Sequence, residues 1–196
     1  MLNTCVILNG PPNSGKDTLA DLLTAYGFKK QEMKARLYED TANHFDVDLP
    51  ELKRRATDRI LKEEGWYELP YDWELLQSMS PREALIHTSE TVIKPNHGDD
   101  YFGLAAAGKC KLDYATLAVF SDGGFEAEIA PLIDAYKNVL IFRLHRDGCT
   151  FEGDSRDYLE GFDNTYDVDL IDGQPDQAIT EIIEVLDPLI YDLRVA

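Results

Sequence analysis

Four stretches of the chain are continuously apolar, and each is followed by polar or glycine residues. The first, Cys5-Val6-Ile7-Leu8, leads into a glycine-bounded loop. Continuous rather than alternating apolar runs are typical of strands that are buried on both faces. The expected strands lie at about residues 4–9, 115–120, 138–144 and 168–171.

Amphipathic segments separate these runs and predict helices at about residues 16–26, 34–46, 50–64, 101–110 and 175–190. A further helix is expected after Ser80, since Ser80-Pro81-Arg82-Glu83 supplies an N-cap, a proline at the first position and an acid at the third. Strands alternating with helices predict a three-layer α/β fold with a central parallel sheet and helices on both faces. No repeat or linker is evident, so residues 1–196 are expected to form one domain.

The loop after the first apolar run has the form of a phosphate-binding loop. It runs from Gly10 to Thr18 between an expected strand and an expected helix. Its glycines let successive backbone N–H groups point at one anion, and the helix that starts at Lys16 adds its positive end. The sequence therefore predicts binding of ATP. The predicted contacts are Gly10, Asn13, Ser14, Gly15, Lys16, Asp17 and Thr18.

One position of this loop differs from the usual pattern. Asp17 stands where serine or threonine normally holds Mg²⁺, and Thr18 follows it. A carboxylate and a hydroxyl are both oxygen ligands suited to Mg²⁺. Asp17 and Thr18 are both candidate metal ligands, and the sequence does not decide between them.

Polar residues at the ends of the later strands are the next candidates, because ligands of parallel sheets bind beyond the carboxyl ends of the strands. Asp122 follows the second strand, and Arg143 and Arg146 end the third. Asp122 and Arg143 are predicted to bind the substrate. The glycine-containing stretch after Arg146 resembles a lid over residues 146–158, with Arg156 near its far end. Arg146 is predicted to act catalytically, because phosphoryl transfer depends on cations around the migrating group.

Three further basic residues are candidates for holding an acceptor phosphate: Arg36, Arg82 and Lys94. Arg82 is the most informative, because the helix dipole favours acids rather than bases at a helix start. A bound anion at that helix end would account for it.

The composition excludes several partners. The chain carries 37 acidic and 19 basic residues, a formal net charge of −18. Nucleic acid and anionic membrane surfaces would be repelled, so neither is expected as a partner. The three cysteines form no paired motif, so no disulfide framework or zinc site is indicated. No membrane-length apolar run or leader-like start is evident, so the cytoplasm is the expected location.

Together, four landmarks resemble the deoxynucleoside monophosphate kinases of tailed bacteriophages, within the P-loop nucleoside monophosphate kinase group. They are Ser14–Thr18, the Ser80–Leu85 motif with Lys94 and Gly98–Phe102, the strand end Ser121–Phe125, and Phe142–Arg146 with the following lid. The resemblance implies a P-loop kinase fold, with Mg²⁺ and ATP as cofactors and host cytoplasm as the location. It also implies that Lys16 holds the transferred phosphate, that Arg82 and Asp122 address a deoxynucleoside monophosphate, and that Arg146 belongs to the lid.

One departure from that family concerns Lys94, where an arginine is expected. A lysine keeps the charge but loses the two-pronged hydrogen bonding of arginine. Two alternatives stay open: a P-loop kinase for another phosphorylated small molecule, such as a phosphomevalonate-like acceptor, and a nucleotide-binding regulatory protein without transfer activity. A homodimer is also left open.

Overall fold

The computed structural model describes residues 1–74, 76–154 and 156–195, and a five-stranded sheet lies at its centre. The strand order is β2-β5-β1-β6-β7, and every neighbouring pair in it is parallel. The strands are β1 (Leu2–Asn9), β2 (Lys29–Gln31), β5 (Leu117–Phe120), β6 (Tyr136–Arg146) and β7 (Thr165–Leu170). Because β1 is the middle strand, the loop after it leaves from the centre of the carboxyl edge, where ligands of such sheets bind.

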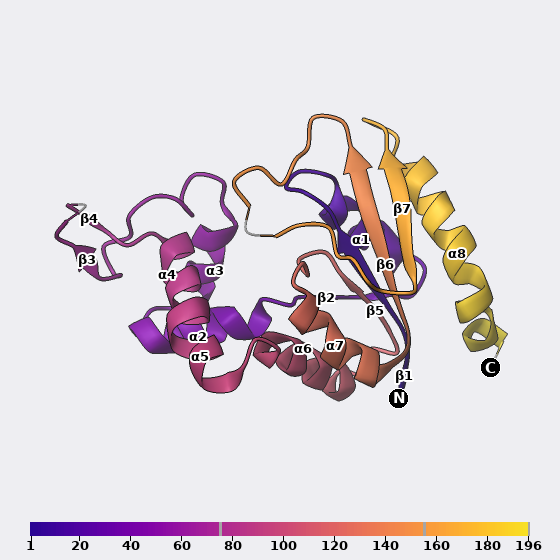
Figure 1. Ribbon diagram of the computed structural model, residues 1–196, viewed down its shortest axis with the longest axis horizontal. Coiled ribbons are helices and arrows are strands. Elements are labelled where there is room, and N and C mark those ends of the chain that lie inside the picture. Colours follow the sequence, from indigo (N-terminus) through magenta and orange to yellow (C-terminus); the bar gives the residue numbers. More distant parts are fainter. Residues whose placement is uncertain (75, 155, 196) are drawn as a thin grey trace. The chain divides into compact units, whose positions relative to one another are not determined.

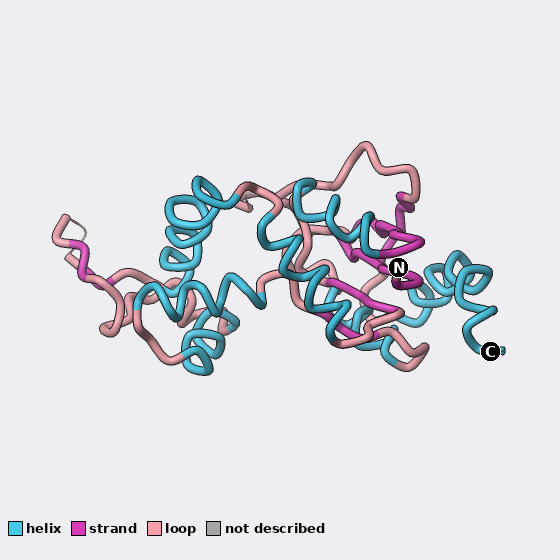
Figure 2. Tube along the Cα trace, turned by 90° about the horizontal axis from the view of Figure 1, so that it is seen from below, coloured by secondary structure: helices cyan, strands magenta, loops and turns pink. Residues whose placement is uncertain are grey.

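Helices pack on both faces of this sheet (Figures 1 and 2). Helices α1 (Lys16–Thr24) and α8 (Pro175–Val195) cover one face, and α6 (Tyr101–Leu112) and α7 (Glu126–Ala135) cover the other. The predicted three-layer α/β fold is therefore confirmed.

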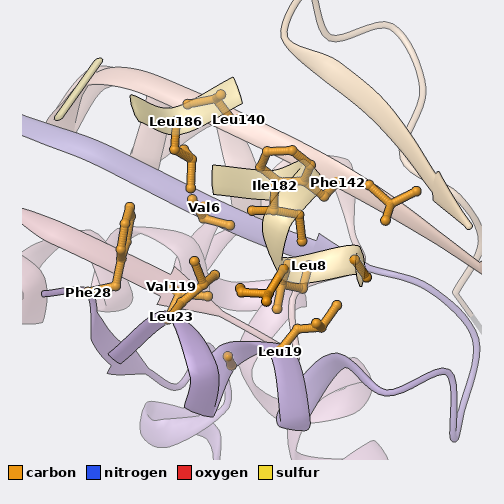
Figure 3. Packing of buried hydrophobic residues seen from close by; sticks show 14 of the residues in the cluster. Val6, Leu8, Leu19, Leu23, Phe28, Val119, Leu140, Phe142, Ile182 and Leu186 are labelled. Atoms are coloured by element: carbon orange, nitrogen blue, oxygen red, sulfur yellow. The ribbon is translucent and has the colours of Figure 1, made fainter. Parts of the chain in front are cut away.

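Alternate residues of β1 enter two separate cores, which explains its continuous apolar sequence. Val6 and Leu8 pack with side chains of α1 and α8, as Figure 3 shows. Cys5 and Ile7 face the other way and pack with side chains of α6 and α7. All four are fully buried. Each large aliphatic side chain buried in this way contributes about 1.5–3 kcal/mol, so the two helix layers hold the sheet from both sides.

The chain divides into two compact units, Met1–Met33 with Gly103–Ala196, and Lys34–Phe102. The first contains the sheet. The second contains α2 (Ala35–Phe45), α3 (Leu49–Thr57), α4 (Pro81–His87), a π-helical segment η1 (Thr88–Ile93), α5 (Lys94–His97), and the hairpin strands β3 (Tyr71–Asp72) and β4 (Gln77–Ser78). Its core gathers around the fully buried Trp66 and Leu52.

The start of α4 is capped as its sequence predicts. The Glu83 N–H donates to Ser80 Oγ at 3.2 Å, and the Ser80 N–H donates to Glu83 Oε2 at 2.7 Å. Helix α4 continues directly into the wider π-helical segment η1, which ends shortly before Pro95. Proline has no N–H and its ring clashes with the carbonyl four residues earlier, so a wider turn there accommodates it.

The predicted helix at residues 50–64 is wrong in its second half. Helix α3 ends at Thr57, and Asp58 adopts an extended backbone. The Asp58 carboxylate then accepts hydrogen bonds from the N–H groups of Ile60 and Leu61, at 2.8 and 2.9 Å, and so starts a separate turn. Aspartate competes with helix continuation through such local bonds.

The other predicted elements are present with small shifts at their ends. No helix among the described residues is long and apolar enough to cross a bilayer.

Candidate active site

The loop after β1 closes tightly on itself. A side chain at Gly10 would place its Cβ 2.8 Å from Ser14 Oγ and 3.0 Å from the Leu144 carbonyl, so only glycine fits there. Gly15 has a φ of 97° and Asn13 a φ of 64°, both in the left-handed region. Helix α1 starts at Lys16 with no side-chain cap, which leaves its first N–H groups directed at the loop. The loop has the geometry of an anion site.

Lys16 folds back over this loop. Its amine donates to the carbonyls of Gly10 and Pro11, each at 2.6 Å, and approaches Ser14 Oγ at 3.4 Å. Burial, and after it the positive charge of Arg156, lower the pKa of Lys16 to about 8. An anion bound in the loop would favour the charged amine, so Lys16 is placed to respond to a phosphate.

Asp17 lies beside the end of β5. Ser121 Oγ donates to Asp17 Oδ1 at 2.7 Å, and the amine of Lys30 on β2 lies 3.4 Å from the same oxygen. In most P-loop proteins the loop supplies a hydroxyl and the neighbouring strand supplies the acid. Here the two groups are exchanged: the loop supplies the carboxylate and the strand end supplies the hydroxyl. Ser121 was not predicted, although it directly precedes Asp122 in the sequence.

Thr18 faces a different part of the site. It lines a pocket of about 170 Å³ that also includes loop residues. The other lining residues come from the loop, the end of β6 and the turn before α8: Ser14, Gly15, Leu19, Arg146, Leu170, Ile171, Asp172, Gly173 and Pro175. Its walls are partly apolar, as a nucleoside requires.

Arg146 closes one side of this pocket. One guanidinium nitrogen donates to the Asn13 carbonyl at 3.0 Å, and another pairs with the Asp172 carboxylate. The structure therefore joins Arg146 to the phosphate-binding loop and to the turn before α8.

Asp122 follows Ser121 and is half-buried. Its carboxylate accepts a hydrogen bond from the Met33 N–H at 2.9 Å. This bond connects the end of β5 to Met33, which is the last residue of the Met1–Met33 segment of the sheet-containing unit.

Arg156 lies near Lys16, although it is distant in sequence. Asp154 accepts from its Nε and Nη2 at 2.9 and 2.7 Å, and the charges of Asp154, Asp122 and Glu128 help to raise the pKa of Arg156. The side chain lies against Gly124, where an added Cβ would be 2.6 Å from Arg156 Cδ. The sequence identified Arg156 only as the far end of a lid. Its place beside Lys16 depends on tertiary contacts. The predicted lid includes residue 155, which lies outside the described residues.

Arg143 forms its contacts on the sheet surface, across the neighbouring strands β6 and β7. It donates to both carboxylate oxygens of its register partner Asp167, at 2.9 and 2.6 Å, and His145 Nε2 lies 2.6 Å from Asp167 Oδ1. These contacts lower the pKa of Asp167, the Arg143 hydrogen bond being the larger cause. Arg143 thus forms a cross-strand ion pair here, and its predicted role in substrate binding stays a prediction.

The three basic residues predicted for the acceptor belong to the unit of residues 34–102, where each has an acidic neighbour. Arg36 lies 2.9 Å from Asp40 and donates to the Tyr101 hydroxyl at 3.1 Å. Arg82 pairs with Glu63 at 2.9 Å, which provides an anionic partner near this helix start. Lys94 pairs with Glu90 at 2.6 Å.

Comparison with known proteins identifies the fold. No protein-family model matches the chain, and no curated protein matches it either. Among solved structures, an unliganded sugar kinase from Janibacter sp. HTCC2649 is similar with a TM-score of 0.52 and 12% identity, covering 95% of each chain. A gluconokinase from Sinorhizobium meliloti 1021 is similar with a TM-score of 0.50 and 14% identity, covering 99% of this chain and 97% of that one. The chain therefore has the fold of the P-loop kinases.

Proposed function

We propose that the protein is an ATP-dependent phosphotransferase. The observation that carries this proposal is the fold of Lys16 over the phosphate-binding loop, where its amine contacts the Gly10 and Pro11 carbonyls and lies near enough to Arg156 for that positive charge to act on it. Two partly buried cations held close together repel each other, and an anion between them offsets that cost. A migrating phosphoryl group is such an anion, and fixed cations around it are the main requirement of phosphoryl transfer.

The residues beside Lys16 fit Mg²⁺. Asp17 offers a carboxylate, and the Ser121 hydroxyl lies 2.7 Å from it. This oxygen-only set matches the ligands that Mg²⁺ prefers. When bound, Mg²⁺ would neutralise charge on the outer phosphates of ATP. We assign this role to Asp17 and Ser121 rather than to Thr18, because Asp17 and Ser121 contact each other whereas Thr18 lines the pocket with Arg146 and Leu170.

That pocket suits the nucleoside of ATP. Leu170, Ile171 and Pro175 offer apolar surface, and Arg146 offers a planar cation at the edge. A purine can lie between apolar side chains and a guanidinium plane, because arginine stacks readily on aromatic faces. Arg146 would then bind the donor nucleotide, in addition to the lid role predicted from the sequence.

For the acceptor we propose a deoxynucleoside monophosphate. This acceptor is supported by the sequence resemblance, in which Arg82 and Asp122 are the residues expected to contact the acceptor. The bond between Arg36 and the Tyr101 hydroxyl adds a cation beside an aromatic ring, a combination that suits a nucleotide phosphate and base. Tyr38 and Phe102 are buried, so they serve the core rather than a stacking surface.

A second candidate acceptor is a sugar or sugar acid. A sugar kinase and a gluconokinase are among the similar structures, and both align with nearly the whole chain. The phosphomevalonate-like acceptor proposed from the Gly-Lys-Asp loop belongs in the same test.

The test is ADP formation from Mg²⁺-ATP with a panel of acceptors. The panel holds the four common deoxynucleoside monophosphates, their ribose counterparts, gluconate and phosphomevalonate. Turnover with deoxynucleotides supports the proposal and identifies the base, and Lys16→Ala should abolish it while the folded structure is kept. Turnover with gluconate alone would replace the proposed acceptor. ATP binding without turnover on any acceptor would favour a regulatory nucleotide-binding protein.

A further inference from the structure

Asp40 is an acidic residue whose side chain lies almost entirely inside the unit of residues 34–102. It belongs to the middle of α2, and only 10% of its side chain is exposed. One carboxylate oxygen, Oδ2, is buried and has no hydrogen-bond partner among the residues that the structure describes. A buried carboxylate is costly to keep unless a cation is paired with it, so the cation beside Asp40 is informative.

That cation is Arg36, one turn earlier on the same helix. Arg36 Nε lies 2.9 Å from Asp40 Oδ1 and donates a hydrogen bond to the Tyr101 hydroxyl at 3.1 Å. If Arg36 turned away into solvent, the Asp40 charge would be left buried without its partner. The burial of Asp40 therefore holds Arg36 in place, although 47% of the Arg36 side chain is exposed.

The Tyr101 hydroxyl is held in position as well. The Tyr101 ring makes an edge contact with the ring of Phe102, with 5.2 Å between the centroids, and its centroid lies 5.1 Å from that of His97. Phe102 itself is buried. Arg36 Nε is thus bound by a buried carboxylate and by a hydroxyl whose ring is packed against its neighbours.

Both contacts use one nitrogen of the guanidinium, and the two terminal nitrogens point to a second role. Glu39 Oε2 lies 3.8 Å from Arg36 Nη1, which is beyond hydrogen-bond distance. Within the described part of the chain, neither Nη1 nor Nη2 donates a hydrogen bond. Two parallel N–H groups of one guanidinium can bind a phosphate or a carboxylate through two hydrogen bonds.

The stability of α2 does not account for the pair of Arg36 and Asp40. Arg36 lies in the first turn of the helix, which contains no acidic residue, and the helix dipole favours acids there. A pair four residues apart is also more favourable when the acid precedes the base, and here the base comes first. A bound anion would account for a fixed cation at this place.

We propose that Asp40 and Tyr101 are positioning residues that hold the Arg36 guanidinium for the oxyanion of the acceptor. The proposal rests on the proposed function, because a deoxynucleoside monophosphate and gluconate both carry an oxyanion. Arg36 binds this oxyanion through Nη1 and Nη2, and Asp40 and Tyr101 act on it only through Arg36 Nε. A neutral sugar lacks the group that this arrangement binds.

The first test observes Arg36 directly and needs no turnover. In NMR spectra of protein labelled with ¹⁵N-arginine, the Arg36 Nε–H signal is identified by its loss in Arg36→Lys. This signal is followed while inorganic phosphate, the deoxynucleoside monophosphates or gluconate is added without ATP. A shift with phosphate and the nucleotides supports the proposal for a phosphate-bearing acceptor, and a shift with gluconate alone supports it for a carboxylate. An Arg36 signal that none of these ligands moves would overturn it.

Two substitutions of Asp40 separate positioning from charge. Asp40→Leu removes the oxygen that binds Arg36 Nε, whereas Asp40→Asn removes the same negative charge and keeps an oxygen acceptor. Positioning predicts that Asp40→Leu weakens binding of the active ligand by about tenfold and Asp40→Asn by less than about twofold. Charge alone predicts that both variants bind the anion more tightly, because each loses a nearby acid. Equal effects of the two substitutions would overturn the proposal.

Glu39→Leu is the matched control, since it removes the neighbouring acid of the same helix and should not weaken binding. Asp40→Ala repeats the test if Asp40→Leu does not fold, as judged by circular dichroism. In the Arg36→Gln background, Asp40→Leu should change the affinity by less than about twofold. A further loss of the full size in that background would show that Asp40 does not act through Arg36.

Kinetics provide the second readout. Asp40→Leu and Tyr101→Phe should raise the KM for the acceptor with little change in the KM for ATP, because only acceptor binding depends on Arg36. Turnover that is unchanged in a folded Asp40→Leu protein would overturn the proposal and leave the proposed function intact. If phosphate moves the Arg36 signal but no acceptor is phosphorylated, the proposed function fails and the NMR titrations still decide the role of Asp40.

Discussion

Lys16 links the local environment of one amine to nucleotide binding. Its pKa of about 8 lies below the ordinary value for lysine, with burial as the larger cause. Below pH 8 the amine is charged, and the triphosphate of the proposed ATP substrate would bind it at no protonation cost. Above pH 8 the free protein loses the proton, and binding must restore it.

We therefore expect ATP affinity to weaken as the pH rises from 7.5 to 9.5, by up to about tenfold per pH unit above 8. Titration calorimetry at fixed Mg²⁺ measures it. Lys16→Arg stays charged across this range and should lack the break near pH 8. A native protein whose affinity is flat over the range would contradict the assigned environment of Lys16.

The exchanged carboxylate and hydroxyl at Asp17 and Ser121 allow a sharp substitution test. Asp17→Ser removes the carboxylate and should weaken the apparent Mg²⁺ affinity by about tenfold or more, as loss of a charged ligand does. Adding Ser121→Asp restores one carboxylate and one hydroxyl in the usual arrangement, and should recover much of the loss.

Magnesium dependence of ATP binding is the measurement, since it does not require turnover. Thr18→Ala is the matched control, because Thr18 lines the pocket with Arg146 and Leu170 and, in the part of the chain that the structure describes, makes no hydrogen bond to Asp17 or Ser121. A larger loss of Mg²⁺ dependence in Thr18→Ala than in Asp17→Ser would reverse the assignment.

At the scale of elements, α6 contains two glycines with opposite surroundings. A Cβ at Gly103 would lie 2.3 Å from the Glu128 carbonyl of α7, whereas a Cβ at Gly108 would meet nothing within 4 Å. Gly103 permits close contact between the two helices. Gly108 only adds flexibility.

Gly108→Ala should raise the free energy of unfolding by about 0.5–1 kcal/mol, because alanine favours the helix and glycine does not. Gly103→Ala should lower it by about 1–3 kcal/mol, because backbone atoms must move apart. Urea unfolding of the two variants measures both. Equal effects at the two positions would argue against the close packing of α6 on α7.

The elements that the sequence predicts well are those whose pattern is local. Strands β1, β5 and β6 are continuous apolar runs because both of their faces are buried. Strand β2 was missed, since Lys29-Lys30-Gln31 is a short polar edge strand that only its pairing with β5 defines. The second half of the predicted helix at 50–64 failed because one aspartate side chain caps a new turn.

The candidate site also has a part that the local sequence predicts and a part that depends on tertiary contacts. The phosphate-binding loop is contiguous, so its residue types predict its shape. Asn9 is joined by two hydrogen bonds to the backbone of Asp157 and Leu159, about 150 residues later in the chain and directly after Arg156. No local pattern contains that information. A polar residue that ends an apolar strand directly before Gly10 was the one available signal for Asn9.

At the scale of the whole molecule, the net charge of −18 acts on stability. Like charges spread over a compact chain repel one another, and salt screens them within a Debye length of about 10 Å at 0.1 M. Raising KCl from 0.02 to 0.3 M should therefore raise the melting temperature by roughly 2–4 °C, which corresponds to about 1 kcal/mol for a chain of this size. A fall in melting temperature would show that paired charges dominate over the repulsion.

The central place of β1 also has a consequence for how the protein is made. Its two neighbours are β5 and β6, which follow more than 100 residues later in the chain. During synthesis the phosphate-binding loop emerges about 100 residues before the strands that hold it in shape, which are complete only after residues 117–146. Such distant pairings are slow to form, because a long loop must close first. The nascent chain thus gains the shape of its phosphate-binding loop only after β5 and β6 have emerged, and Leu170 and Pro175 of the pocket follow later still.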